Sequence, residues 1–344
     1  MPIYSIQANN DSMSDIVKRL EYIPKISVVI PLHNKAEYIA KTIDSILSQT
    51  IKEYEVIVVG GKSNDGSEEI VKKYVELDSR ITLIEELGVG VSAARNQGVN
   101  MAKGDLVAFL DADDEWLPNF LETILSLRKQ YPNAGLYGTG FYILKKGIST
   151  ECIYNPKSGE QIISNYFKAK NNFGDFLIMT SFMAIPKDIY LSVGGFPENF
   201  IQHEDRCLRG KIALEYDVAY SPELCGKYNF NYLTYRNRAS KYISDPFSVH
   251  VSENYDKIKS KINWKDIVEF CDRGKNGIII LNLEWNKERK KVREDIRSIA
   301  SKKFRYKKMR LYAISYMPRI CFHCLQNLLR LAQNINNIMN NSPR

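Results

Sequence analysis

The chain has 344 residues, 44% of them hydrophobic, which is enough to bury a full-sized core. Its net charge of +8 is unevenly distributed, because residues 287–344 carry +12 and the rest of the chain carries −4. Six cysteines are scattered without the spacing of a disulfide framework, and the first residues lack the basic and apolar segments of a secretory leader. These features argue against a disulfide-rich secreted domain and indicate a reducing, cytoplasmic environment.

The first half of the chain alternates β-rich runs with helical patterns. We expect strands at Ile26–Pro31, Tyr54–Val59, Ile81–Glu85 and Leu106–Leu110. We expect helices over Ala36–Gln49 and Gly66–Leu77, where apolar residues recur at helical spacing. This alternation predicts an α/β fold with a mostly parallel sheet and helices on both faces. After Tyr137 the pattern becomes irregular, and beyond about Ser248 it is helical and increasingly basic.

An acidic turn, Asp111-Ala112-Asp113-Asp114, directly follows the last of these apolar runs. Carboxylates at the end of a strand offer hard oxygen ligands, which suit Mg²⁺ or Mn²⁺ bound to substrate phosphates. The alternative is an acidic loop that caps a helix beginning near Trp116-Leu117-Pro118.

Four segments in a fixed order carry a resemblance to a known family. They are Ile26–Lys35, Ile43–Thr50, Gly90–Asn96 and the acidic turn, and together they resemble a family 2 glycosyltransferase. The resemblance covers roughly residues 25–221 and implies a GT-A-like nucleotide-binding sheet that takes an activated sugar with a divalent cation. It divides the chain into an N-terminal extension (1–24), a GT-A-like domain (25–247) and a helical, basic C-terminal region (248–344). Within the domain, residues 25–115 would bind the nucleotide and residues 116–247 the acceptor.

The same resemblance assigns residues to the donor site. Asp113 would ligate Mn²⁺ or Mg²⁺ on the donor diphosphate, while Asp111 would support the ribose or the metal. A dication there would stabilise the departing diphosphate as a Lewis acid. Arg95 and Asn96 would approach the nucleotide, although Arg95 could also be an ordinary cation on a helix surface. The remaining implied donor residues are Pro31, His33, Asn34, Asp65 and Ala112.

The sequence departs from the family pattern where the second strand ends. An acidic pair that recognises the nucleobase is expected there, but this chain has Gly60-Gly61. Asp65 follows a few positions later and either compensates or only caps the next helix. His33 stands where the family often has an aromatic residue against the base. A UDP-sugar is the expected donor.

A second family signature is Gly194-Gly195-Phe196 followed by His203-Glu204-Asp205. The resemblance implies that Asp205 is the general base, which takes the proton of the acceptor hydroxyl during an inverting in-line displacement. Glu204 would orient the acceptor or cap the helix. The alternative for Asp205 is a carboxylate placed at a helix start, where the helix dipole favours it.

The C-terminal region has a strongly basic segment, residues 302–310, with six basic residues in nine positions. We expect residues 302–331 to contact anionic lipid and to lie in the membrane interface without crossing it. This predicts a peripheral protein on the inner face of the cell membrane. Apolar residues from Cys321 to Met339 at alternating spacings of four and three could instead pack on a partner helix or form a homo-oligomer. We expect no nucleic-acid binding.

Two functions remain open from the sequence. The first is an inverting, hexosyltransferase-type glycosyltransferase of polysaccharide biosynthesis, acting on a glycan or lipid-linked acceptor. The second is a catalytically inactive nucleotide-binding or scaffolding protein of the same fold, a possibility that Gly60-Gly61 raises.

Overall fold

The computed structural model describes residues 23–61, 63–145, 147–155, 161–174, 176–200, 202–230, 243–261, 263–284 and 288–316. The predicted N-terminal extension lies almost entirely outside these ranges, as do the apolar residues from Cys321 to Met339 and the part of the predicted lipid-binding segment beyond residue 316. None of the helices in the described ranges is both long enough and apolar enough to span a membrane.

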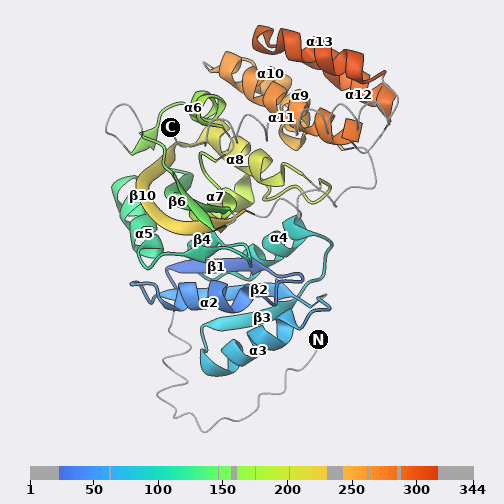
Figure 1. Ribbon diagram of the computed structural model, residues 1–344. Helices are drawn as coiled ribbons and strands as arrows, with labels where there is room; N and C mark the ends of the chain where they lie inside the picture. The colour runs from blue at the N-terminus through green and yellow to red at the C-terminus, as the bar shows by residue number, and fades with distance from the viewer. Residues whose placement is uncertain are drawn as a thin grey trace, which may run out of the picture.

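A mixed sheet forms the centre of the molecule (Figure 1). Its parallel part has the order β3-β2-β1-β4, formed by β1 (Ile26–Pro31), β2 (Tyr54–Gly60), β3 (Ile81–Glu85) and β4 (Leu106–Phe109). These are the four strands predicted from the sequence, with ends that differ by at most one residue. Sequence pattern locates these strands because each short apolar run is bounded by polar turn residues.

The second half of the chain continues this sheet in the order β4-β9-β6-β10-β5. Strand β9 runs antiparallel to both β4 and β6, whereas β10 is parallel to β6. Two further strands pair at the side, β7 with β6 and β8 with β10. The bounds are β5 (Glu115–Trp116), β6 (Leu136–Lys145), β7 (Ile148–Cys152), β8 (Ile162–Ile163), β9 (Met183–Pro186) and β10 (Val218–Asn229). Trp116 therefore lies in a strand, and the helix expected to begin near it starts after Pro118.

Helices cover both faces of the sheet, as predicted, and alternate strand residues divide between two hydrophobic clusters. One face packs against α2 (Ile39–Leu47), α3 (Ser67–Leu77) and α5 (Phe120–Gln130). The other face packs against α4 (Val91–Met101), α6 (Tyr166–Phe173), α7 (Lys187–Ser192) and α8 (Glu204–Glu215). Val28 and Val29 illustrate the division, because these neighbours on β1 point into different clusters.

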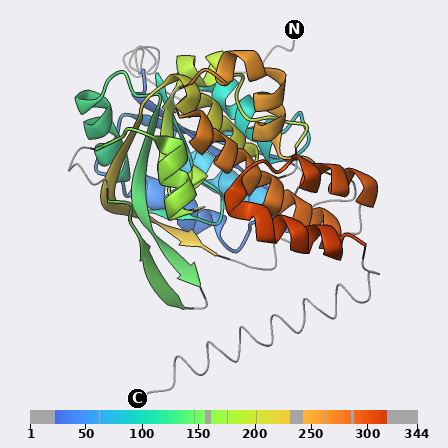
Figure 2. The same cartoon turned by 90° about the horizontal axis from the view of Figure 1, so that it is seen from above.

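The C-terminal helices begin within the main core. Phe247 of α9 (Pro246–Glu253), Ile258 of α10 (Tyr255–Ile258) and Phe270 of α11 (Trp264–Glu284) belong to the same cluster as α6 and α8. A separate small cluster joins the end of α11 to α12 (Arg289–Ser298) and α13 (Arg305–Ile314), which follows the short 3₁₀ turn η2 (Lys302–Phe304). Seen from above, these helices lie beside the helices of the second half of the sheet domain (Figure 2). The domain boundary at residue 247 remains a prediction, and α9 crosses it.

Candidate active site

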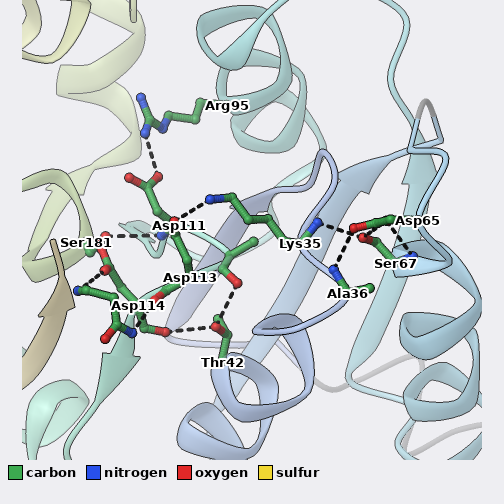
Figure 3. Close-up of polar contacts among 12 residues, drawn as sticks. Lys35, Ala36, Thr42, Asp65, Ser67, Arg95, Asp111, Asp113, Asp114 and Ser181 are labelled. Carbon is green, nitrogen blue, oxygen red and sulfur yellow. Dashed lines mark hydrogen bonds and ion pairs between the residues drawn. The ribbon is translucent and has the colours of Figure 1, made fainter. Parts of the chain in front are cut away.

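The acidic turn Asp111–Asp114 lies directly after β4, where the parallel strands end. The Thr42 hydroxyl of α2 donates to the carbonyls of Ala112 and Asp114 at 3.0 and 2.9 Å. The backbone N–H of Asp111 donates to Ser181 Oγ at 3.1 Å, in the 3₁₀ turn η1 (Thr180–Phe182). The turn is therefore fixed from both sides by neutral groups (Figure 3).

Asp114 is the buried anchor of this turn. Its carboxylate accepts hydrogen bonds from the Ser181 hydroxyl and from the backbone N–H of Asn229, the latter at 2.9 Å. Burial, together with the charges of Asp111 and Asp113, raises the pKa of Asp114 well above its usual range. Asp114 therefore has a structural position, and it holds Asp111 and Asp113 at the surface of the site.

Asp113 and Asp111 remain partly accessible, with side chains that are 23% and 33% exposed. Asp113 pairs with Lys35, and Asp111 pairs with Arg95 at 2.6 Å (Figure 3). Lys35 belongs to the loop after β1, at the switch point of the strand order where α/β sheets commonly bind ligands. Each of these acids thus has a cationic partner.

Arg95 connects the acidic turn to the second signature of the sequence. Its guanidinium also contacts Glu204 of α8 at 3.4 Å and lies over the Phe196 ring, 4.9 Å from the centroid. The Arg95 side chain is only 4% exposed, so it is not the surface cation that the sequence left as an alternative. An acid after β4 and an acid at the start of α8 therefore share one buried cation.

The two neighbouring acids Glu204 and Asp205 have opposite electrostatic environments. Burial and the charge of Asp205 raise the pKa of Glu204 above its usual range. Burial also opposes ionisation of Asp205, but the charge of Arg209 and its 2.7 Å hydrogen bond outweigh that effect and hold the pKa of Asp205 well below its usual range. Asp205 is therefore ionised before any substrate reacts, whereas Glu204 takes up a proton more readily.

The turn into α8 rests on a buried ion-pair network. Asp245 accepts a 3.2 Å hydrogen bond from Arg206 Nη1 and contacts His203 Nδ1 at 2.9 Å. His203 has a φ of +64°, a conformation that few non-glycine residues adopt and that often marks functional turns. Gly274 lets α11 approach this network, because a Cβ there would lie 2.2 Å from Arg206 Nη1. Helix α11 thus supports the start of α8 directly.

The loops after β1 and β2 are tied together at the predicted nucleobase side. Asp65 accepts from the backbone N–H of Ala36 at 2.9 Å and from Ser67 at the start of α3 (Figure 3). The Asn34 side chain accepts from the backbone N–H of Asn64 at 2.9 Å. The Glu68 carboxylate accepts hydrogen bonds from the backbone N–H groups of Gly61 and Ser63 at 2.7 and 3.1 Å. Asp65 therefore has the partners of a capping residue, and its contact with a base stays a prediction.

The remaining predicted donor residues differ in accessibility. His33 is exposed beside the exposed Asn34, and Pro31 is the half-buried last residue of β1. The Asn96 amide instead bonds Phe196 and Glu198, with Nδ2 at 2.9 Å from the Phe196 carbonyl. Asn96 thereby fixes the Gly194–Glu198 loop to α4, and its contact with a nucleotide stays a prediction.

Asp111 and Asp113 offer oxygen ligands but do not form a complete metal cage. Among the described residues, no group of three or more His, Cys, Asp or Glu side chains is arranged to hold a cation. Two accessible carboxylates fit Mg²⁺ or Mn²⁺ when a substrate supplies further oxygens, because Mg²⁺ commonly takes one or two carboxylates together with phosphates. The residues therefore fit a cation that arrives with a diphosphate.

Sequence reasoning missed several members of this site, notably Lys35 as the partner of Asp113, together with Ser181 and Asp245. Lys35 could have been found, because it is the last residue of the segment Ile26–Lys35 that carries the family resemblance. Ser181 could not have been found, since its partner Asp114 lies 67 residues away in the chain. Asp245 has the local signal of a helix cap, because it accepts from Ser248, but its contacts with His203 and Arg206 are long-range.

Known glycosyltransferases resemble this chain in sequence. The sequence profile described as "Glycosyl transferase family 2" matches residues 27–187. The amylovoran biosynthesis glycosyltransferase AmsB of Erwinia amylovora is 30% identical over 208 residues, which cover 57% of this chain and 67% of AmsB. Three other bacterial glycosyltransferases, 34 to 42% identical, are matched over only 15 to 35% of their own length.

Solved structures share the fold at low sequence identity. Staphylococcus aureus TarS 1–349 in complex with UDP-GlcNAc superposes with a TM-score of 0.57 at 14% identity, covering 88% of this chain and 92% of that one. The mannosyltransferase PcManGT of Pyrobaculum calidifontis, in complex with GDP-Man and Mn²⁺, gives a TM-score of 0.51 at 19% identity, covering 94% and 89% of the two chains. This chain therefore shares its overall fold with TarS, which was solved with UDP-GlcNAc, and with PcManGT, which was solved with GDP-Man and Mn²⁺.

Proposed function

Because the chain belongs to glycosyltransferase family 2, we propose that it is an inverting, hexosyltransferase-type enzyme that moves a sugar from a UDP-sugar to a glycan or lipid-linked acceptor. The observation that carries this proposal is the placement of Arg95 between Asp111 and Glu204. Arg95 contacts an acid that the resemblance assigns to the donor, Asp111, and one that it assigns to the acceptor, Glu204. This supports a single site for donor and acceptor.

The chemistry follows from these positions. The acceptor hydroxyl attacks the anomeric carbon, the bond from that carbon to the diphosphate oxygen breaks, and its electron pair leaves with the nucleotide. Asp205 takes the hydroxyl proton, and Arg95 is held where it offsets negative charge on the donor side. Asp113 and Asp111 would hold a divalent cation, which when bound would supply Lewis-acid stabilisation of the departing diphosphate. Lys35, the ion-pair partner of Asp113, adds positive charge on the same side of the site.

The choice of UDP is supported by the fold shared with TarS, which was solved with UDP-GlcNAc. PcManGT, which was solved with GDP-Man, makes a guanosine donor the main competitor. The loop after β2 has Gly60-Gly61 in place of the usual acidic pair. The exposed residues His33 and Asn34, in the loop after β1, are therefore our candidates for contact with the nucleobase.

Peripheral membrane attachment belongs to the same proposal. Helix α13 exposes Tyr306 and Met309, which are 83% and 64% exposed, beside the exposed Arg305 and Arg310. Aromatic and apolar side chains interleaved with basic ones suit an anionic lipid surface. Replacing Arg305 and Arg310 with Gln should reduce co-flotation with anionic vesicles, and unchanged flotation would count against this surface.

The catalytic proposal is tested by incubating the full chain with UDP- and GDP-sugars, Mn²⁺ and an acceptor-bearing membrane extract, and by measuring nucleotide release. Release should depend on the cation, should be fastest with a UDP-sugar, and should fall in Asp113→Asn. Tight nucleotide binding without release from any donor would favour the inactive scaffolding protein.

A further inference from the structure

A pocket lies between the start of α8 and the C-terminal helices, and residues on both sides of Asp205 in the sequence, His203 and Arg206, line it. It has a volume of about 220 Å³, smaller than the roughly 300–1,000 Å³ of sites that enclose a whole drug-sized ligand. Side chains from α6, α8, α11, η2 and α13 line it. His203 links it to the site already described, because His203 directly precedes Glu204 and Asp205. A volume of this size suits one small group of a larger substrate.

The lining is strongly cationic. Lys170, Arg206, Arg273 and Lys307 all contribute, and no acid is found among the described residues that line the pocket. Asp245 and Glu269 lie behind the lining, where they pair with Arg206 and Arg273, and the charge of Asp205 interacts with that of Lys170. Three acids against four basic side chains leave a net positive charge, and positive charge in a concave, partly desolvated site concentrates anions.

The positive charges of Arg273 on α11 and Lys307 on α13 repel each other. Partial desolvation and the nearby charge of Arg273 lower the pKa of Lys307. Lys170 is 3% exposed, and its charge also helps to keep Asp205 ionised, so this lysine lies close to both the pocket and the proposed base. An anion placed among these cations would relieve their repulsion within reach of Asp205.

Helix α11 also places the buried polar side chain of Asn276 at the pocket. Asn276 is 2% exposed, and its Oδ1 accepts no hydrogen bond from the residues that the structure describes, while its Nδ2 donates to the Asp272 carbonyl at 2.8 Å. Arg273 Nε forms an ion pair with Glu269 at 3.6 Å, a distance too long for a hydrogen bond. Buried polar atoms are normally hydrogen-bonded, so the Asn276 oxygen beside the pocket indicates a ligand with a hydrogen-bond donor, such as a hydroxyl.

We propose that this pocket binds a phosphate group carried by the acceptor and thereby places the acceptor hydroxyl at Asp205. This inference rests on the proposed glycosyl transfer and specifies its acceptor as a phosphate ester. Arginine and lysine are the side chains that best bind phosphate oxygens. Asn276 Oδ1 can accept from a hydroxyl on the same substrate. The phosphate belongs either to a lipid-linked carrier or to a phosphate-bearing glycan, which share this chemistry.

The first test needs no sugar transfer. Inorganic phosphate and pyrophosphate are titrated into the full chain by calorimetry at constant ionic strength, with chloride as the balancing anion. We expect saturable binding that weakens at least about tenfold in Lys307→Gln and in Arg273→Gln, a loss that corresponds to about 1.4 kcal/mol. Lys265→Gln is the matched control, because Lys265 is an exposed cation of α11 outside the pocket. No saturable binding, or equal weakening in the control, would overturn the proposal.

Folding is checked independently through the melting temperature and UDP binding, both of which should be unchanged in Lys307→Gln because Lys307 belongs to no buried cluster of the described core. The second test compares acceptors once a transferring donor is known. The pocket variants should raise KM for a phosphorylated acceptor about tenfold and leave the donor KM unchanged. Lipid-phosphate acceptors in vesicles and water-soluble phosphorylated glycans distinguish the two sources.

Two outcomes separate the proposals. Transfer that proceeds equally well to acceptors without phosphate, and that phosphate does not inhibit, would remove the pocket's role and leave the glycosyltransferase intact. Phosphate binding that depends on Lys307, without nucleotide release from any donor, would contradict the proposed transfer and with it the acceptor role of the pocket.

Discussion

Two acidic regions of this molecule are held in opposite ways. The turn after β4 is fixed by neutral donors around Asp114, whose pKa is raised, and it leaves Asp111 and Asp113 partly exposed. The start of α8 is fixed by buried arginines, which hold the pKa values of Asp205 and Asp245 low. Because neutral groups hold the turn after β4, Asp111 and Asp113 can exchange their present partners, Arg95 and Lys35, for another cation without loss of the turn. The buried arginines instead favour the ionised forms of Asp205 and Asp245.

The largest expected effect comes from the two acids that begin α8. Asp205→Asn should lower kcat by about 10²- to 10⁴-fold, the usual contribution of a general base, and Glu204→Gln should lower it much less. Steady-state nucleotide release measures both. Because the pKa of Asp205 is lowered, the rate should show no acid limb above the ordinary carboxylate range.

The pH profile can reverse this assignment. A base must be deprotonated, so if Glu204 were the base, the rate would fall with decreasing pH at values above its ordinary pKa of 4.5. Such a limb, abolished in Glu204→Gln, would transfer the role of base to Glu204.

The next effect compares the buried anchors of the two regions. Asp245→Asn leaves buried Arg206 without its counter-charge and should reduce the free energy of unfolding by about 3–5 kcal/mol. Asp114→Asn removes a charge that burial and the neighbouring acids already disfavour, as the raised pKa of Asp114 indicates, and should cost less than about 1.5 kcal/mol. Urea unfolding of the two variants at neutral pH measures the difference, and equal losses would contradict the contrast drawn between the regions.

Acid unfolding sharpens the same comparison. The pKa of Asp245 is lowered on folding, so its stabilisation is present above the ordinary value of 3.8 and is lost as the pH falls toward the folded value. The pKa of Asp114 is raised, so its effect has the opposite sign, and that stabilisation is lost as the pH rises. Asp245→Asn should therefore flatten the acid side of the stability curve.

A smaller effect concerns the fit of α11 against the ion pairs at the start of α8. Gly274→Ala would place a Cβ 2.3 Å from Asp245 Oδ1 and should destabilise the fold by about 1–3 kcal/mol. Gly277→Ala is the matched control, since its Cβ would lie 3.2 Å from His203 Cε1 and both changes gain the same helix propensity. Thermal unfolding that ranks the two variants in the reverse order would show that α11 does not depend on this close approach.

The smallest effect tests the neutral groups that hold the turn after β4. Thr42→Val removes the hydroxyl that serves the Ala112 and Asp114 carbonyls and should cost roughly 0.5–1.5 kcal/mol. Thr42→Ser, which keeps the hydroxyl, should lose less. Equal stability of the two variants in chemical denaturation would mean that the hydroxyl does not hold the turn.

The sequence predicted the parts of the molecule that depend on local pattern. Strands β1 to β4 and the acidic turn could be placed because short apolar runs end at polar residues. The antiparallel strands β6 and β9 were not predicted, because their pairing joins segments more than forty residues apart. The same reason hid the partners of Asp113 and of Arg206. Long-range ion pairs become visible only when the fold brings their members together.

The position of α11 in the main core determines where this polypeptide can be shortened. Truncation after residue 247 would strip Phe270 from beneath α8 and leave Arg206 and Asp245 open to water, so the fragment should aggregate or lose its acceptor side. Truncation after residue 301 spares that packing, but it removes Leu311 from the small cluster and Phe304 and Lys307 from the proposed phosphate pocket. The apparent appendage is thus two pieces, and the first is as indispensable to the catalytic half as any strand of the sheet.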